Sequence, residues 1–384
     1  MTPTTAVPQV LDRARDITQP LMREAVDRLV PSIRAVVSYH LGWTDAQGNP
    51  SDVRGGKGVR PALAMLSAEA AWADAAVGAP GGVAIELVHN FSLVHDDLMD
   101  GDQERRHRPT VWALWGPSVA LLAGDALSTL ATEVLLTTPG PTAAGAAAAL
   151  GEATAEMIAG QADDLAFEAR RTVSVEECMA MCTAKTGALL GCDASIGAIL
   201  AAAPPATVRA LRDFGRHLGV AFQAVDDLLG IWGDPAATGK PAGNDIRHRK
   251  KSMPIVAALA AGNDESRELE ALLLGPGNTR PAGETGADGD SPEIARAASM
   301  TKEHSTKRSP AAPDWRPAVP RPLSQEQVAR ATWLVEASGG RAWTAARAKA
   351  HLDAALGSLE GARLSAVPRR ALADLAVYVV ERES

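Results

Sequence analysis

The chain has 384 residues, of which 46% are apolar and only 4% aromatic. A core this rich in alanine favours closely packed helices, because alanine is the best helix former and lets helix axes approach one another. With 38 Lys and Arg against 46 Asp and Glu, the net charge is -8. That balance argues against nucleic-acid binding, which depends on a basic surface.

The cysteines and the apolar segments indicate a cytoplasmic protein without a membrane span. The three cysteines are too few and too close together for a secreted disulfide framework. The first residues are polar and soon charged, so we expect no signal peptide. Residues 134–151 carry no charge, but Pro139-Gly140-Pro141 and the many alanines do not suit a bilayer.

Helical periodicity runs from residue 8 to about residue 274 without a convincing alternating strand. Ser174 and Glu177 fit a capping box that precedes an apolar run. The pattern predicts an all-α fold, with residues 1–384 forming one domain.

The composition changes at residues 276–322, which contain 8 Pro and 4 Gly in 47 residues and few large apolar side chains. Such a segment cannot bury enough surface to offset its ordering entropy, so we expect a disordered insert. A docking segment for a partner is the alternative. Ser324 and Gln327 then fit a second capping box, and we expect the helices of residues 323–384 to pack on the main bundle.

The first acidic motif ends a helix predicted over residues 83–99. Asp96 and Asp100 are four residues apart and share one helix face, with Asp97 beside them. Like charges at this spacing destabilise a helix unless a cation neutralises them. Carboxylate oxygens suit Mg²⁺, whereas the alternative is a solvated acidic helix end.

A second pair, Asp226 and Asp227, follows Gln223 in another helical pattern. Two acidic helix ends facing one another could hold metal ions between them. Mg²⁺ keeps waters and commonly shares its ligands with a phosphate group. The two motifs therefore predict a diphosphate bridged by magnesium, and cations are available nearby along the chain: Lys57, Arg60, Arg105, Arg106, Lys185, Lys240 and residues 247–251.

Together these motifs resemble the trans-isoprenyl diphosphate synthases (polyprenyl synthetases) from about Gly55 to Pro254. The matches, in chain order, are Gly55-Gly56-Lys57 with Arg60 and Pro61, His89, Asp96-Asp97 with Asp100, Arg105-Arg106, Gly160-Gln161 with Asp164, Lys185-Thr186, Gln223 with Asp226-Asp227, Gly239-Lys240, Asp245, and Lys250 with Ser252 and Pro254. The resemblance implies a helical bundle around a deep central cavity, and a homodimer.

The chain departs from the family's pattern at three positions. Gly230 stands where the second motif usually carries a third aspartate, which questions the affinity of the metal held there. Gly58 replaces a common arginine, and His107 replaces the usual glycine after the arginine pair.

By resemblance, an allylic diphosphate is bound through three Mg²⁺ ions held by Asp96, Asp97 and Asp100 on one wall and Asp226 and Asp227 on the other. Arg105, Lys185, Lys240 and Lys250 would add positive charge around that group, which becomes a better leaving group. The carbonyls of Lys185 and Thr186 and the amide oxygen of Gln223 would stabilise the allylic cation left behind.

The second substrate implied is isopentenyl diphosphate, held without metal by Lys57, Arg60, His89 and Arg106. Its double bond would attack the cation, and a proton would leave to the released pyrophosphate. Two rival functions remain open. A class I terpene cyclase has no use for Lys57 and Arg60, and a non-catalytic partner subunit would have lost aspartates or cations.

Product length is predicted from the residues before the first motif. Ser92 lies one turn below Asp96, about 5.4 Å along the axis, and is too small to stop a growing chain. Phe91 is the first bulky side chain, and in relatives of this pattern it goes with a C20 product. The sequence thus predicts geranylgeranyl diphosphate, with farnesyl diphosphate or a longer product as alternatives and simple core packing of Phe91 as the other interpretation.

Overall fold

The computed structural model describes residues 6–51, 58–234, 242–275 and 323–381. Its first half contains α1 (Ala6–Asp27), α2 (Pro31–His40), α3 (Val59–Ala70), α4 (Ala75–Asp100), α5 (Val111–Trp115), α6 (Pro117–Leu136) and α7 (Ala143–Ala169). Its second half contains α8 (Val175–Cys182), the π-helix η1 (Thr183–Gly187), α9 (Ala188–Asp193), α10 (Ile196–Leu200), α11 (Pro205–Trp232), α13 (Asn244–Arg247), α14 (Met253–Ala260), α15 (Asp264–Leu274), α16 (Gln325–Ala337), α17 (Gly340–Glu360) and α18 (Ala366–Glu381).

The prediction of an all-α fold is confirmed. A single short antiparallel hairpin, β1 (Glu104–Arg105) with β2 (Arg108–Pro109), interrupts the helices of the described part of the chain. Its strands have two residues each, too short for an alternating pattern to reveal. The predicted insert at residues 276–322 lies outside the described residues.

Both predicted capping boxes are present. The Ser174 hydroxyl accepts from the Glu177 backbone N–H, and the Glu177 carboxylate accepts from the Ser174 N–H. Ser324 and Gln327 make the same reciprocal pair at the start of α16. Each box satisfies two backbone donors that a helix start leaves unpaired.

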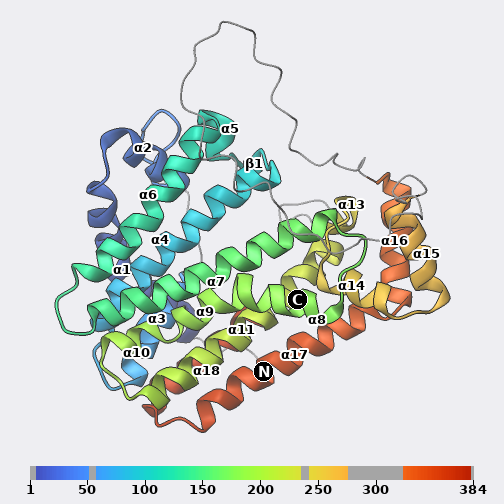
Figure 1. Cartoon of the computed structure of the whole chain (residues 1–384). Coiled ribbons are helices and arrows are strands. Elements are labelled where there is room, and N and C mark those ends of the chain that lie inside the picture. The colour runs from blue at the N-terminus through green and yellow to red at the C-terminus, as the bar shows by residue number, and fades with distance from the viewer. Residues whose placement is uncertain (1–5, 52–57, 235–241, 276–322, 382–384) are drawn as a thin grey trace, which may run out of the picture.

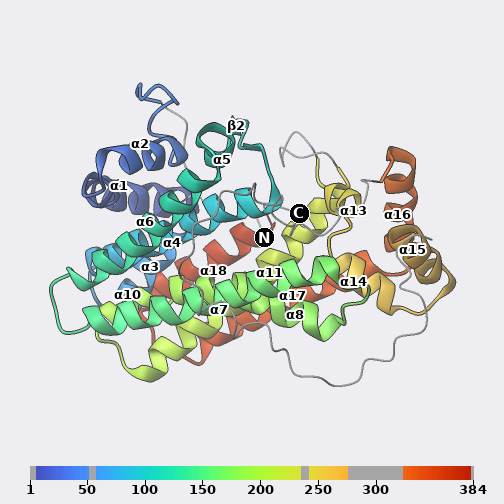
Figure 2. The same cartoon turned by 45° about the horizontal axis from the view of Figure 1, so that its top comes forward.

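Figures 1 and 2 show α1 and α2 at one end of the molecule and α15 and α16 at the other, with α7, α11 and α17 between them. The helix α11 packs against α17, α9 and η1, and α18 packs against α3, α1 and α11. The C-terminal helices therefore close the same bundle that the earlier helices begin.

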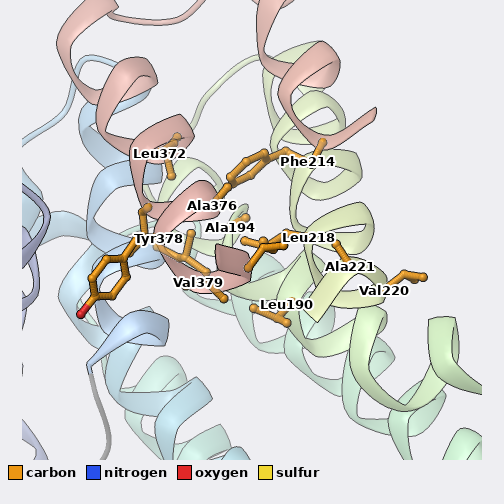
Figure 3. Close-up of a cluster of buried hydrophobic side chains, with 14 of the residues drawn as sticks. Leu190, Ala194, Phe214, Leu218, Val220, Ala221, Leu372, Ala376, Tyr378 and Val379 are labelled. Carbon is orange, nitrogen blue, oxygen red and sulfur yellow. The ribbon is translucent and has the colours of Figure 1, made fainter. Parts of the chain in front are cut away.

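The main core gathers side chains that lie far apart in the sequence. Figure 3 shows Phe214 and Leu218 of α11 beside Leu190 of α9 and Leu372 and Val379 of α18. Phe214, Leu218 and Leu372 are fully buried. This packing holds the middle of α11 in place, and α11 carries the second acidic motif at its far end.

Close helix contacts depend on glycine where α11 crosses α9. A Cβ at Gly215 would lie 2.2 Å from the Leu190 carbonyl oxygen. We expect Gly215→Ala to lower the free energy of unfolding by ~1–3 kcal/mol, because the backbones must move apart. A melting curve by circular dichroism measures this.

Gly151→Ala is the matched control, since nothing lies within 4 Å of a Cβ at that position in α7. It should raise stability by roughly 0.5–1 kcal/mol through helix propensity. Equal melting temperatures for the two variants would contradict the tight α11–α9 contact.

Candidate active site

The first acidic motif forms the last turn of α4. The helix begins at the N-cap Asp74, whose side chain accepts from the Ala76 N–H, and ends at Gly101 with φ 72°. Asp96 is half-buried and Asp100 is exposed, and neither makes an ion pair with another described residue. These two carboxylates are presented together on one face, as the four-residue spacing predicts.

Asp97 points elsewhere and is only 2% exposed. Its Oδ1 accepts from Arg105 Nε at 2.7 Å. Arg105 belongs to the β hairpin, whose turn residues Arg106 and His107 have φ of 52° and 60°. Left-handed backbone favours glycine, which explains physically why glycine is usual at the position of His107. The pairing of Asp97 with Arg105 links the hairpin to the end of α4.

Burial sets the protonation of these carboxyl groups. It raises the pKa of Asp96 to about 6, with the charge of Lys185 opposing and that of Asp100 adding to the shift. It raises the pKa of Asp97 to about 6 as well, against the charge of Arg105. The pKa of Asp100 is also raised by burial, against the charges of Lys185 and Lys250. Ionising these buried carboxyl groups therefore costs free energy, and a bound cation would lower that cost.

On the second wall, a chain of hydrogen bonds links three elements. The Thr186 hydroxyl donates to Gln223 Oε1 at 2.7 Å, and Gln223 Nε2 donates to Asp227 Oδ1 at 2.8 Å. The Met253 backbone N–H, at the start of α14, donates to Asp227 Oδ2 at 2.8 Å. Both oxygens of Asp227 thus accept from the protein, while Asp226 lies on the exposed side of α11. The two carboxylates have different surroundings because adjacent helix residues point about 100° apart, and their role as metal ligands stays a prediction.

Lys185 and Thr186 lie in the π-helix η1. The ammonium of Lys185 is 2.6 Å from Asp164 Oδ2 of α7. Glycines let this segment lie between two helices. A Cβ at Gly160 would lie 2.4 Å from the backbone nitrogen of Lys185, and one at Gly219 would lie 2.7 Å from the Gly187 Cα. Short π-helices are frequent at functional sites, and here η1 carries Lys185 to Asp164 and to the charges of Asp96 and Asp100.

Lys250 connects the two acidic motifs electrostatically. Burial alone would lower its pKa, but the carboxylates of Asp245, Asp227 and Asp164 raise it. The charge of Lys250 also acts on Asp100 across the site. The two motifs, 130 residues apart in Asp97 and Asp227, therefore share the charge of Lys250.

The missing third aspartate of the second motif has a structural counterpart. An ideal Cβ at Gly230 would lie 2.5 Å from Asp245 Oδ2 and 2.9 Å from Oδ1. The carboxylate of Asp245 thus occupies the space beside Gly230 that a side chain there would need. Gly230 and the Asp245 carboxylate of α13 together fill the place that the side chain of a third aspartate would take.

A second cluster contains the predicted isopentenyl residues Arg60, His89 and Arg106, with His89 two turns before Asp96 on the same face of α4. Arg60 Nη2 lies 3.4 Å from His89 Nδ1. Burial, with the charges of Arg60 and Arg106, lowers the pKa of His89 well below its usual value, so the imidazole is neutral. Lys57 and Lys240, predicted for the two diphosphates, lie outside the described residues.

Sequence reasoning missed His40 at the end of α2. Burial and the charges of Arg105 and Arg106 lower its pKa to about 3. With these arginines, Asp97 and Arg108, it lines a pocket between α2, α4 and the hairpin. A histidine 49 residues from His89 carries no motif by itself, so only the fold brings it to the site.

Phe91 and Ser92 lie on different sides of α4. The Phe91 ring is 9% exposed and meets the His95 ring edge-on, with 4.9 Å between centroids. His95 Nε2 lies 3.2 Å from the Leu121 carbonyl of α6, opposite Gly124, where a Cβ would meet it at 2.1 Å. The Phe91 ring therefore packs against His95, which contacts with α6 hold in place. Its role as a chain-length floor stays a prediction.

The residues fit the magnesium that such acidic walls imply. Among the described residues, no group of three His, Cys, Asp or Glu side chains is placed to hold a metal ion by itself. The donors are hard carboxylate oxygens with raised pKa values, which suit Mg²⁺ shared with a phosphate ligand rather than an all-protein site.

The chain is similar to known proteins along nearly its whole length. Residues 50–282 match the polyprenyl synthetase family. A (2E,6E)-farnesyl diphosphate synthase from Mycobacterium tuberculosis (strain ATCC 25618 / H37Rv) is 44% identical over 375 residues, covering 98% of this chain and 93% of that protein. A geranylgeranyl diphosphate synthase from the same strain is 43% identical over 268 residues, covering 70% and 77%.

Solved structures agree in fold. A polyprenyl synthetase from Streptomyces coelicolor A3(2) superposes with a TM-score of 0.82 at 47% identity, covering 97% of this chain and 99% of that one. A geranylgeranyl pyrophosphate synthase from Corynebacterium glutamicum, complexed with isoprenyl diphosphate and magnesium, has a TM-score of 0.73 at 26% identity, covering 98% and 99%.

The raised pKa of Asp96 makes stability depend on pH. Because the folded-state pKa of about 6 lies above the ordinary 3.8, the folded protein binds this proton more tightly than the unfolded chain does. The resulting contribution to the free energy of unfolding is fully present at low pH and is lost as pH rises through 6. In the metal-free protein, Asp96→Asn should therefore raise the melting temperature by roughly 2–4 °C at pH 8 and change it little at pH 4.

Asp163→Asn, at an exposed position of α7, is the control and should shift neither temperature. A gain from Asp96→Asn that is as large at pH 4 as at pH 8 would show that the charge of Asp96 is not the cause.

Proposed function

Because the chain belongs to the polyprenyl synthetase family and is a trans-polyprenyl diphosphate synthase, a prenyltransferase, we propose that the two acidic walls bind the allylic diphosphate and that Arg60, His89 and Arg106 bind isopentenyl diphosphate. The observation that carries this assignment is the place of Lys250, whose charge acts on Asp100 of α4 and on Asp227 of α11, while Lys185 pairs with Asp164 and acts on Asp96 and Asp100.

The magnesium ligands would be Asp96, Asp100 and Asp226, together with Asp97 and Asp227. The last two would also orient the neighbouring groups that hydrogen-bond to them. Bound Mg²⁺, three ions by resemblance, supplies Lewis-acid charge that makes diphosphate a better leaving group. Asp97 holds Arg105 toward the same diphosphate. Asp245 contributes the carboxylate beside Gly230 that the second motif lacks.

The allylic cation that forms needs electron-rich groups that are fixed before the reaction. Gln223 Oε1 is held by the Thr186 hydroxyl, and Gln223 Nε2 is held by Asp227. The amide therefore presents its oxygen at a fixed place, which lowers the cost of reorganisation as charge develops. Attack by the isopentenyl double bond forms the new carbon–carbon bond, and loss of a proton to the released pyrophosphate completes the condensation.

Loss of one acidic ligand tests this assignment. Asp96→Asn should lower kcat/KM by roughly 10³-fold at saturating Mg²⁺, because leaving-group activation depends on the metal charge. Radiometric condensation of isopentenyl with geranyl diphosphate measures it, with Asp163→Asn as the control of unchanged activity. Near-normal turnover in Asp96→Asn would remove this aspartate from the metal site.

We further propose farnesyl diphosphate (C15) as the main product. The support is the farnesyl diphosphate synthase that is 44% identical over 98% of the chain. The rigid bracing of Phe91 by His95 agrees with an early stop to elongation. Geranylgeranyl diphosphate (C20) is the second candidate, favoured by the small Ser92 and by the relative that is 43% identical over 70% of the chain.

Product chromatography after incubation with isopentenyl and geranyl diphosphates separates these lengths. We expect C15 from the wild type and longer products from Phe91→Ala, because the variant removes the braced ring. Met99→Ala, at an exposed site within the motif, should keep the C15 product. A C20 product from the wild type would restore the prediction made from the sequence. An unchanged length in Phe91→Ala would place the floor on another helix.

We also propose that the enzyme is a cytoplasmic homodimer joined through α6 and α7. Leu121, Leu122 and Leu136 of α6 are 47%, 57% and 57% exposed, and Ile158 of α7 is 50% exposed. By length and composition α6 would also suit a membrane, although 39% of its most apolar window is buried. A second copy of this chain would cover these side chains, and all three cysteines are buried free thiols, as a reducing compartment allows.

Light scattering after gel filtration tests the dimer. Leu122→Glu should convert a dimer into a monomer, because it places a charge at the centre of an apolar face. Val367→Glu, at an 80% exposed site of α18, should leave the dimer intact. A monomeric wild type, or a dimeric Leu122→Glu, would contradict this surface.

A further inference from the structure

Asp193, the last residue of α9, is a charged group that the proposed chemistry does not use. It is 0% exposed, and neither carboxylate oxygen has a hydrogen-bond partner among the described residues. A buried carboxylate without hydrogen bonds is costly, and proteins usually pair or replace it. The energetics of α9 alone therefore do not explain an aspartate here.

The cation nearest to Asp193 is Arg60 of α3. Arg60 Nη1 lies 3.5 Å from Asp193 Oδ2, and its side chain is 18% exposed. The other terminal nitrogen, Nη2, lies 3.4 Å from His89 Nδ1 of α4. The guanidinium is thus held at both ends, by a carboxylate from α9 and by a neutral imidazole from α4.

The backbone around Arg60 leaves little freedom to move. A Cβ at Gly82 would lie 3.0 Å from the Cα of Pro61, so α4 passes close to the first turn of α3. The charges of Arg105 and Arg106 also reach this cluster, since both act on His89. Arginines that gather in one region repel each other while the anions they bind are absent. A buried counter-charge on one of them opposes that repulsion.

The electrostatics of Asp193 agree with this geometry. Burial raises its pKa to about 7, the charge of Arg60 opposes that shift, and the charge of Glu86 adds to it. Arg60 is therefore the cation that favours the ionised form of Asp193.

We propose that Asp193 is a positioning residue that orients Arg60 for the diphosphate of isopentenyl diphosphate. The inference rests on the proposed role of Arg60 in that subsite. Asp193 touches no substrate; it fixes the guanidinium before the substrate arrives, which lowers the ordering cost of binding. Its effect belongs to one substrate, because its ion pair is with Arg60, which is proposed to bind isopentenyl diphosphate.

Steady-state kinetics of Asp193→Asn test this role. We expect the KM for isopentenyl diphosphate to rise about tenfold, the size expected for one charge-assisted contact. The KM for the allylic substrate and kcat should stay within about twofold.

Cys192→Ser is the matched control, since Cys192 is the neighbouring buried residue of α9 and the hydrogen bonds and ion pairs of Arg60 among the described residues go to His89 and Asp193. It should leave both KM values unchanged. A fall in melting temperature with unchanged KM in Asp193→Asn would make Asp193 a structural residue and overturn the proposal. An equal rise in both KM values would overturn it as well.

Arg60→Gln separates this inference from the function on which it rests. If Arg60→Gln raises the KM for isopentenyl diphosphate but Asp193→Asn does not, the subsite stands and only the positioning role fails. If Arg60→Gln has no effect, the subsite assignment fails and the inference with it. In the Arg60→Gln background, Asp193→Asn should add less than twofold, because the two residues act through one contact.

Discussion

Carboxylates brought together in a half-buried site repel one another, and the rest of this active site is organised around that repulsion. Burial raises the pKa of Asp96 and Asp97 to about 6 and that of Asp227 to about 7. Lys185 and Lys250 lie among these groups and partly neutralise them. The bundle can hold the two acidic ends together because the cations come from separate elements, one from η1 and one from the segment before α14.

The helix packing serves the same end. Glycines at positions 160 and 219 let η1 lie directly against α7 and α11. That contact brings Lys185 to Asp164 and Thr186 to Gln223. A side chain at either glycine would push η1 outward, and the hydrogen-bond chain from Thr186 to Asp227 would be lost. Close packing and charge balance are thus one constraint here, and the alanine-rich composition makes it attainable.

Successive turns of α4 serve the two proposed substrate subsites. His89 lies two turns before Asp96 on the same helix face, where it meets Arg60 beside Asp193 of α9. Asp97 and Arg105 join the end of α4 to the hairpin. A single 26-residue helix therefore sets the distance between the metal-dependent subsite and the metal-free one, which is what a condensation of two diphosphates requires.

The sequence by itself determined the helical class, both capping boxes, the two acidic motifs and the family, because each of these depends on spacing within one element or on a run of neighbouring residues. It did not determine which aspartates are paired. Asp227 uses both oxygens within the protein, and this depends on where α14 begins in space. Only the tertiary structure placed Asp245 beside Gly230, His40 beside Arg105, and Asp193 beside Arg60. Each of these contacts joins residues 15 to 133 positions apart, and no local pattern records a distance that the packing of helices decides.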